Sequence, residues 1–405
     1  MEKQRRRLLI ILYLGFISLG LPDTALGVAW PRMRLDLKAP LEWAGGLMSL
    51  TTALSVIASL AAARLMKKYH TGSIMAVCAL MTSLAMLGYG LAPVFAAVAG
   101  FTILFGLGQG AVDSAVNAYM ARHYSARQMN WIHGCWGLGA TTGPLIFTAA
   151  FSLGLPWRAG YLALFGLQFA LGLLFTATLG WWREPPVKNP GPLGAENAEG
   201  PGADNHQPQQ CNNNAGKVKR MTTAGVAFYF FYPGLEVVAG LWAASYLTEY
   251  LAAPASTAGA ALTMYWANLT LGRMAIGFAA DRFRNTTVVR AALVLSAAGL
   301  ALTLIPPEFG QTPAVFTTGL GLLGLGLSPL YPTMMHETPR RCGLERSDQV
   351  ISFQVGAALA GAATLPLLAG LIIRQTGLEA LPRLMAVFAI LLIAAHEASV
   401  DQSRK

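Results

Sequence analysis

The chain has 405 residues, of which 54% are hydrophobic and only 12% are charged, and its formal net charge is +10. A soluble domain is usually about a quarter charged, so this composition excludes an ordinary soluble domain. Apolar runs of about 20 residues, enough to cross a ~30 Å hydrocarbon layer as helix, recur along the chain. We predict an all-α integral membrane protein, because a helix satisfies its own backbone groups in lipid.

Twelve transmembrane helices are predicted in chain order. The first apolar run is too long for the apolar region of a signal peptide, so we take it as the first membrane helix. The expected spans are residues 8–30, 42–64, 73–92, 95–120, 130–153, 158–181, 221–248, 256–279, 287–305, 312–335, 349–373 and 378–397. Their spacing gives an N-terminal six-helix bundle at 1–182 and a C-terminal one at 221–405.

The segment 183–220 separates the two halves and is rich in Pro, Gly, Asn and Gln. It has too few large apolar residues to fold by itself, so we predict a disordered cytoplasmic linker. Basic residues favour the cytoplasmic side of a membrane protein. With the N-terminus inside, most of the 29 Lys and Arg residues fall in cytoplasmic loops. We therefore place both termini in the cytoplasm, at the cytoplasmic (inner) membrane, and expect no nucleic-acid partner.

The two halves resemble each other in sequence. "FGLGQG" at 105–110 is similar to "LGLGLS" at 323–328, and "GATTGPL" at 139–145 is similar to "GAATLPL" at 361–367. The two displacements are nearly equal, as expected of a duplicated transporter whose substrate site lies near the membrane midplane between the repeats. We therefore expect two pseudo-symmetric bundles.

The chain resembles the major facilitator superfamily (MFS) in its two sets of six helices, its long central segment and "GRMAIGFAADRF" at 272–283. The first-half counterpart, "AARLMKKYHTG", keeps basic residues but has Arg64 where an acid is expected. Within the superfamily, "NWIHGCWGLGATTGPL" (130–145) and "GLEVVAGLWAASYLTEY" (234–250) are similar to the fucose and glucose/galactose permeases. The resemblance implies a sugar transporter coupled to protons, with functional acids in the first and fourth helices.

The fourth span carries Gln109, Asp113 and Asn117 at four-residue spacing, which places them on one face of a helix. A charged side chain at mid-bilayer is costly and normally faces a wet cavity or the bundle interior. We predict that Asp113 handles protons and that Gln109 and Asn117 bind substrate. A buried hydrogen-bond network between helices is the alternative.

Two more acids lie in the membrane runs. Asp23 follows Pro22, which removes a backbone hydrogen bond and loosens the first helix. Burial disfavours a charged carboxylate, so Asp23 is expected to take a proton, unless it only caps or gates the outer end. Glu236 in the seventh span aligns with Asp23 across the repeat, and it is either neutral, paired or a coupling group.

His133 in the fifth span completes the proposed proton-coupling set, although a packing role is equally open. Amides bind hydroxyl groups and aromatic rings cover the apolar face of a sugar, whereas aromatics in membrane helices most often only pack. On that basis the further candidates for substrate binding are Asn130, Trp136, Tyr232, Trp242, Tyr265, Trp266, Asn268, Tyr331 and Gln354. Arg273, Asp281 and Arg282 are assigned to an inner gate, with interfacial anchoring as the alternative.

The sequence therefore predicts a secondary active transporter for a small polar solute, with a sugar as first candidate, acting as a monomer in the bilayer. A proton-driven exporter of drugs or lipophilic metabolites is the alternative, since "GLGATTGP" (137–144) is similar to the glycine-proline signature of antiporters. Cys78, Cys135, Cys211 and Cys342 have no disulfide or zinc spacing. The sequence lacks a catalytic triad and a phosphate-binding loop, so we expect neither an enzyme nor a cofactor, with the proton as coupling ion.

Overall fold

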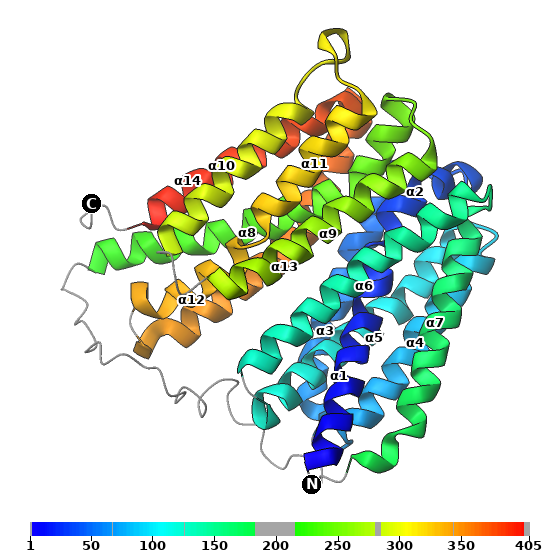
Figure 1. Cartoon of the computed structure of the whole chain (residues 1–405), viewed down its shortest axis with the longest axis vertical. Coiled ribbons are helices and arrows are strands. Elements are labelled where there is room, and N and C mark those ends of the chain that lie inside the picture. The colour runs from blue at the N-terminus through cyan, green and yellow to red at the C-terminus, as the bar shows by residue number, and fades with distance from the viewer. Residues whose placement is uncertain are drawn as a thin grey trace. The chain divides into compact units, whose positions relative to one another are not determined.

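The computed structural model describes residues 2–66, 68–124, 126–182, 215–279, 285–342 and 344–400. These residues fold into helices and short connections (Figure 1). The helices are α1 (Glu2–Asp23), α2 (Ala25–Asp36), α3 (Trp43–Met66), α4 (Thr71–Leu91), α5 (Phe95–His123), α6 (Ala126–Ser152), α7 (Trp157–Ala177), α8 (Ala215–Ser245), α9 (Ala255–Ala279), α10 (Asn285–Thr303), α11 (Pro313–Leu327), α12 (Leu330–Cys342), α13 (Leu344–Thr376) and α14 (Leu381–Ser399). The predicted all-helical class is confirmed.

Ten candidate membrane spans are found among the described residues by length and hydropathy. The first combines α1 and α2, and another combines α11 with the start of α12. The long helices α6 and α9 are less apolar, because Thr, Asn and charged or imidazole side chains interrupt them, but they have 27 and 25 residues. At 1.5 Å per residue they reach about 40 and 37 Å, so each is long enough to cross the bilayer. The described part of the chain thus forms twelve transmembrane helices.

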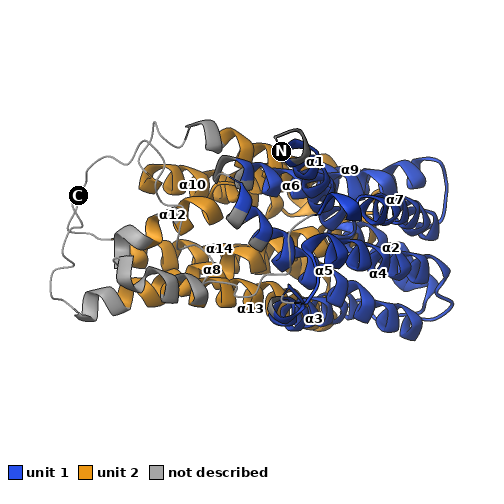
Figure 2. Ribbon diagram, turned by 90° about the horizontal axis from the view of Figure 1, so that it is seen from below, with its two compact units in different colours: residues 1–198, 254–263 blue, residues 199–253, 264–405 orange. Residues whose placement is uncertain are grey.

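The described residues separate into two compact units, coloured in Figure 2. Unit 1 holds α1 to α7 together with residues 254–263 at the start of α9, and unit 2 holds α8, the rest of α9 and α10 to α14. Residues 183–214, most of the expected linker, lie outside the described residues. Helix α8 begins at Ala215, inside the segment that we expected to be linker.

Helix pairing is similar within each unit. In unit 1, α1 packs on α6, and α5 packs on α4; in unit 2, α8 packs on α13, and α11 packs on α10. Glycines make these approaches possible: a Cβ at Gly139 would collide with the carbonyl of Ile17, and one at Gly361 with the carbonyl of Phe230. Small residues let the backbones of membrane helices approach closely. The matching pairs explain why the two halves share glycine-rich motifs.

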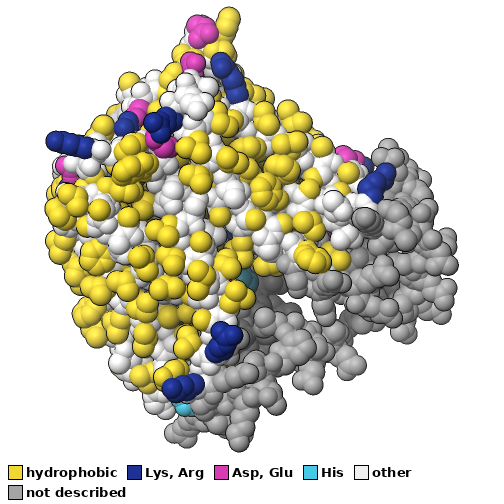
Figure 3. All heavy atoms as spheres, turned by 180° about the vertical axis from the view of Figure 1, so that it is seen from behind, with side chains coloured by type: hydrophobic (Ala, Val, Ile, Leu, Met, Phe, Trp, Pro, Cys, Tyr) yellow, Lys and Arg dark blue, Asp and Glu magenta, His cyan; other side chains and the backbone are white. Residues whose placement is uncertain are grey.

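The outer surface carries many large apolar side chains, including Leu60 at 73% and Val294 at 69% exposed. One face is shown in Figure 3, where hydrophobic side chains cover a broad area and the coloured charged groups lie toward its margins. A soluble monomer rarely exposes so large an apolar area. Lipid contact accounts for it, because acyl chains solvate apolar side chains.

Candidate functional site

Asp23 is the last residue of α1, directly before the helix breaks at Thr24, whose backbone angles are φ −103° and ψ −2°. Its carboxylate accepts a hydrogen bond from Gln109 Nε2 of α5 at 2.6 Å and another from Trp136 Nε1 of α6 at 2.9 Å. Both donors are uncharged. They orient the carboxylate without neutralising its charge, so protonation is the route by which Asp23 becomes neutral.

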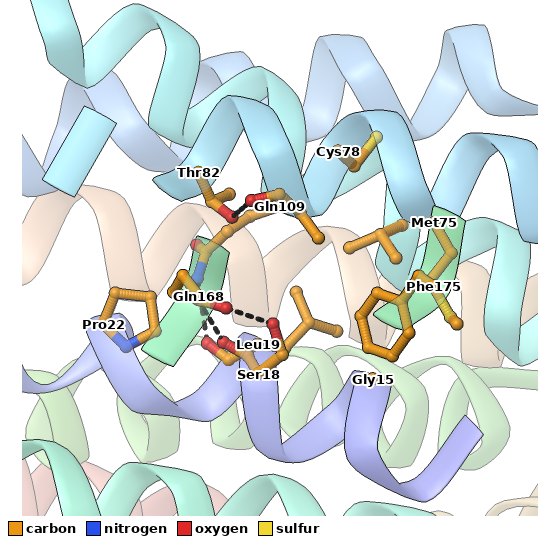
Figure 4. A pocket seen from close by; sticks show the side chains of 12 residues that line it. Gly15, Ser18, Leu19, Pro22, Met75, Cys78, Thr82, Gln109, Gln168 and Phe175 are labelled. Carbon is orange, nitrogen blue, oxygen red and sulfur yellow. Dashed lines mark hydrogen bonds between the residues drawn. The ribbon is translucent and has the colours of Figure 1, made fainter. Parts of the chain in front are cut away.

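The break in α1 follows from Pro22, which has no backbone N–H and therefore leaves the carbonyl of Ser18 without its helical partner. That carbonyl accepts a hydrogen bond from Gln168 Nε2 of α7 at 2.6 Å, and the Ser18 hydroxyl donates back to Gln168 Oε1. Gln168 is 1% exposed. Figure 4 shows the Ser18 and Gln168 side chains turned toward each other beside Pro22. The pair holds the loosened end of α1.

A second carbonyl freed by proline lies on the other side of Asp23. Pro144 inside α6 leaves the carbonyl of Ala140 without its helical donor, and the Thr24 hydroxyl donates to that carbonyl at 2.6 Å. Gly20 brings α1 and α6 together here, because a Cβ at this position would collide with the carbonyl oxygen of Trp136. The backbone around Asp23 is thereby fixed to α6.

The predicted stripe on α5 is present, but its members have different environments. Gln109 is 8% exposed and also donates to the carbonyl of Leu19 at 3.2 Å, so it belongs to the surroundings of Asp23. Asp113 is exposed and accepts from Asn117 Nδ2 at 3.0 Å. Asp113 lies one helical turn after Gln109, on the same face of α5. The structure therefore brings Asp23, Gln109, Asp113 and Asn117 into one polar group in unit 1.

A small cavity adjoins this group between α1, α4, α5 and α7, with room for about one water molecule (Figure 4). Its polar lining consists of Ser18, Thr82, Gln109 and Gln168, and its apolar lining includes Met75 and Phe175. It is too small for a sugar. The cavity therefore belongs to the setting of Asp23 rather than to a solute site.

His133 and Trp136 lie three residues apart on α6. His133 is exposed, and its ring meets Phe16 edge-on with the ring centroids 5.4 Å apart. Trp136, which we expected to bind substrate, instead donates to Asp23. The side chain of Asn130 lies outside the described residues, so the predicted role of Asn130 stays a prediction.

Glu236 is 8% exposed in α8 and forms an ion pair with Arg273 of α9, with 3.0 Å between Oε2 and the guanidinium nitrogen. The same Arg273 nitrogen donates to the Tyr232 hydroxyl at 2.8 Å. Tyr265 fixes the neighbouring backbone by donating to the Glu236 carbonyl at 3.0 Å. Unlike Asp23, its counterpart across the repeat, Glu236 has a cationic partner.

This pair changes the interpretation of Arg273. We expected it to form an inner gate with Asp281 and Arg282, but those two residues lie outside the described part of the chain. Arg273 lies six residues before the end of α9 and contacts Glu236 and Tyr232. Sequence reasoning missed this contact. The signal that could have predicted it is that Glu236 and Arg273, one acid and one base, lie in the apolar runs of two consecutive spans.

Several predicted aromatic residues surround the ion pair. The Tyr232 and Tyr331 rings lie 5.9 Å apart, and Tyr229 meets Tyr331 edge-on while donating to its carbonyl at 2.9 Å. Tyr331 is half-buried, whereas Tyr232 is 1% exposed. Tyr331 is thus the ring in this group with most surface available to a solute.

Other candidates for solute binding are occupied by packing. Trp242 is fully buried and donates to the carbonyl of Pro366 at 3.1 Å, which joins α8 to α13. Tyr265 is also fully buried, and Trp266 lies against Gly240. Gln354 accepts from Thr338 at 3.0 Å inside unit 2. These contacts explain each side chain through helix association.

Asn268 is half-buried and donates to the carbonyl of Gly321 at 3.1 Å, which links α9 to α11. Its oxygen is not involved in that bond, so part of the amide's hydrogen-bonding capacity remains for a solute. Within the described residues, no group of three or more His, Cys, Asp or Glu side chains is arranged to hold a metal ion.

The model of the Major Facilitator Superfamily matches residues 12–234 and 221–400 of the chain. The chain belongs to this superfamily. As one of its members, the chain is a multi-pass membrane protein. A curated relative, Bypass of stop codon protein 6 of Saccharomyces cerevisiae, is 24% identical over 301 residues, which make up 69% of this chain and 59% of the relative. The chain therefore spans less than two thirds of that relative's length.

Solved superfamily structures share the fold. The nucleoside transporter NupG matches with a TM-score of 0.73 at 13% identity, covering 96% of this chain and 98% of NupG. The peptide transporter POT has a TM-score of 0.72 at 12% identity, with coverages of 96% and 94%. The human organic anion transporter MFSD10 has a TM-score of 0.62 at 16% identity, with coverages of 98% and 99%.

Proposed function

We propose that this superfamily member is a secondary active transporter that moves a small, electrically neutral polar solute, with sugars as the first candidates. Protons drive it, and it works by alternating access. In this proposal the two moving halves are the bundle at 1–182 and the bundle that begins with α8 at Ala215. The proposal also keeps cytoplasmic termini, the cytoplasmic membrane and a monomer.

The observation that carries proton coupling is the setting of Asp23. Its carboxylate is held by two uncharged donors at a break in α1, and Asp113 lies one helical turn from Gln109 on α5. A partly buried carboxylate that is held by neutral donors becomes neutral by taking up a proton, which is what a coupling group has to do. A proton can drive transport only if it binds the outward-open and inward-open states with different affinity. The break in α1 beside Asp23 is a point where the backbone can move and change the hydrogen bonds of the carboxylate.

The Glu236–Arg273 pair supports a neutral solute. The pair is neutral as a whole, and it is largely buried, with side-chain exposures of 10% and 29%. An anionic solute that binds Arg273 competes with Glu236 for the same cation, and the site would then hold two anions for one cation in a poorly solvated place. A polyhydroxylated solute bonds to both groups without separating them, because hydroxyls both donate and accept.

Tyr331 and Asn268 add the features that suit a sugar. The half-buried Tyr331 ring supplies a flat apolar face, and the Asn268 oxygen supplies an acceptor. The resemblance of 130–145 and 234–250 to the fucose and glucose/galactose permeases points to the same solutes. Nucleosides are a second neutral, hydroxylated class, and NupG is named as a nucleoside transporter.

The test is uptake into proteoliposomes that contain the purified full-length protein. Radiolabelled glucose, galactose, fucose and uridine are each offered with and without an inward proton gradient. We expect at least one of these solutes to accumulate only with the gradient. Absence of uptake for all four, together with gradient-driven efflux of a lipophilic dye, would reject the proposal in favour of the exporter.

A further inference from the structure

We propose that Gln168 is a positioning residue for Asp23: it binds the Ser18 carbonyl that Pro22 leaves unpaired and so holds Asp23 against Gln109 and Trp136. This role rests on the proposed proton coupling through Asp23. Gln168 belongs to no sequence motif, since it is a lone amide in the apolar run 157–177.

The cost of an unpaired carbonyl explains why Gln168 is needed. A buried backbone C=O without a partner costs about as much as a lost hydrogen bond, and lipid offers no substitute donor. Ser18 is 5% exposed and Gln168 is 1% exposed, so bulk water does not reach this carbonyl. The two residues bond in both directions, which fixes the position and the orientation of the Gln168 side chain.

The position of the contact connects it to Asp23. Ser18 precedes Asp23 by little more than one helical turn, and the intervening Leu19 carbonyl accepts from Gln109. Gln109 therefore bonds both to the backbone that Gln168 holds and to the Asp23 carboxylate. If the Ser18 end of this turn moves, the geometry between Asp23, Gln109 and Trp136 changes with it.

Thr24 provides an independent example of the same arrangement. It directly follows Asp23, and it donates to the Ala140 carbonyl that Pro144 frees in α6. Two backbone carbonyls near Asp23, those of Ser18 and Ala140, lack their helical donors because of a proline. Each accepts a hydrogen bond from a side chain of another helix instead. The arrangement permits a break in α1 while the acid at the break keeps a defined position.

The test uses the full-length protein in lipid nanodiscs, labelled with fluorotryptophan. The chain has 9 Trp residues, and the Trp136 resonance is assigned by its loss in Trp136→Phe. We expect Gln168→Leu to shift the Trp136 fluorine resonance and to lower gradient-driven uptake about tenfold, as for the loss of a buried hydrogen bond. Pro22→Ala restores the backbone donor to Ser18, so adding Gln168→Leu to Pro22→Ala should cause no further shift and no further loss.

Gln311→Leu is the matched control. Gln311 is 6% exposed, and its amide donates to the Thr303 carbonyl at 2.6 Å in unit 2, so its loss resembles that of Gln168 without touching Asp23. The control should leave the Trp136 resonance in place. An unmoved resonance in Gln168→Leu, or an equal shift with and without Pro22→Ala, would overturn the proposal.

Loss of folding and loss of transport are distinguished by comparing the single and the double variant and by the Trp136 resonance. If Gln168→Leu alone does not fold, recovery of the fold in the double variant supports the role, and failure of both variants rejects it. If no solute is taken up by the wild-type protein, the proposed function fails, while the Trp136 resonance still decides whether Gln168 positions Asp23.

Discussion

Arg273 pairs with Glu236 at 3.0 Å, whereas among the described residues Asp23, which aligns with Glu236 across the repeat, accepts from the uncharged Gln109 and Trp136. Equivalent acids in the two halves therefore have opposite electrostatic settings. The acid that is paired with Arg273 is suited to organise a solute site. The uncompensated acid is suited to gain and lose a proton.

The ion pair should couple strongly in stability. Glu236→Gln alone leaves the Arg273 cation without its carboxylate, and we expect a loss of about 2 kcal/mol, less than for a fully enclosed pair because Arg273 is 29% exposed. Adding Arg273→Gln should recover part of this loss, since the unpaired charge is removed. Thermal unfolding in nanodiscs measures both. Losses that simply add would show that the pair is not energetically linked.

Trp242 tests the distinction between packing and solute binding. Trp242→Phe keeps an aromatic ring but removes the hydrogen bond to the Pro366 carbonyl, so we expect about 1 kcal/mol lower stability and an unchanged KM for uptake. Trp131→Phe is the control, because Trp131 is 48% exposed. A large rise in KM for Trp242→Phe alone would return this ring to the solute site.

Gly20 tests the close approach of α1 and α6. Gly20→Ala places a Cβ against the Trp136 carbonyl oxygen, and overpacking of this kind costs about 1–3 kcal/mol. Gly166→Ala on α7 adds the same atom where nothing lies within 4 Å, so its stability should be unchanged or slightly higher. Equal stability of the two variants in thermal unfolding would argue against the close contact.

The fold was predictable because its signals are local. Each span is an apolar run whose length matches the bilayer, and α6 and α9 remain recognisable although Thr, His and Asn lower their hydropathy. The stripe of Gln109, Asp113 and Asn117 was equally predictable from helical periodicity. Contacts between distant helices were not, since no local pattern says that Gln109 reaches Asp23, 86 residues away.

The contacts that the sequence did not predict share one cause. Arg273 was assigned to a gate because it stands close to Asp281 in sequence, but its partner Glu236 lies on the preceding helix. The hydrogen bond from Trp242 to the Pro366 carbonyl was not predicted either, because composition does not distinguish a packed ring from an accessible one. Gln168 was overlooked, although Pro22 removes the backbone donor to the Ser18 carbonyl and so requires a polar side chain to bind that carbonyl.

The most direct measurement of the central claim is solute movement by Asp23→Asn in proteoliposomes, with Asp36→Asn as control, since Asp36 pairs with Arg158 away from the Asp23 group. Asparagine keeps the shape of the side chain but cannot take up a proton. We predict that Asp23→Asn still exchanges solute at equal concentrations on both sides and loses accumulation driven by a proton gradient, while Asp36→Asn retains both. Accumulation by Asp23→Asn at the wild-type level would contradict the assignment of Asp23 as the coupling group.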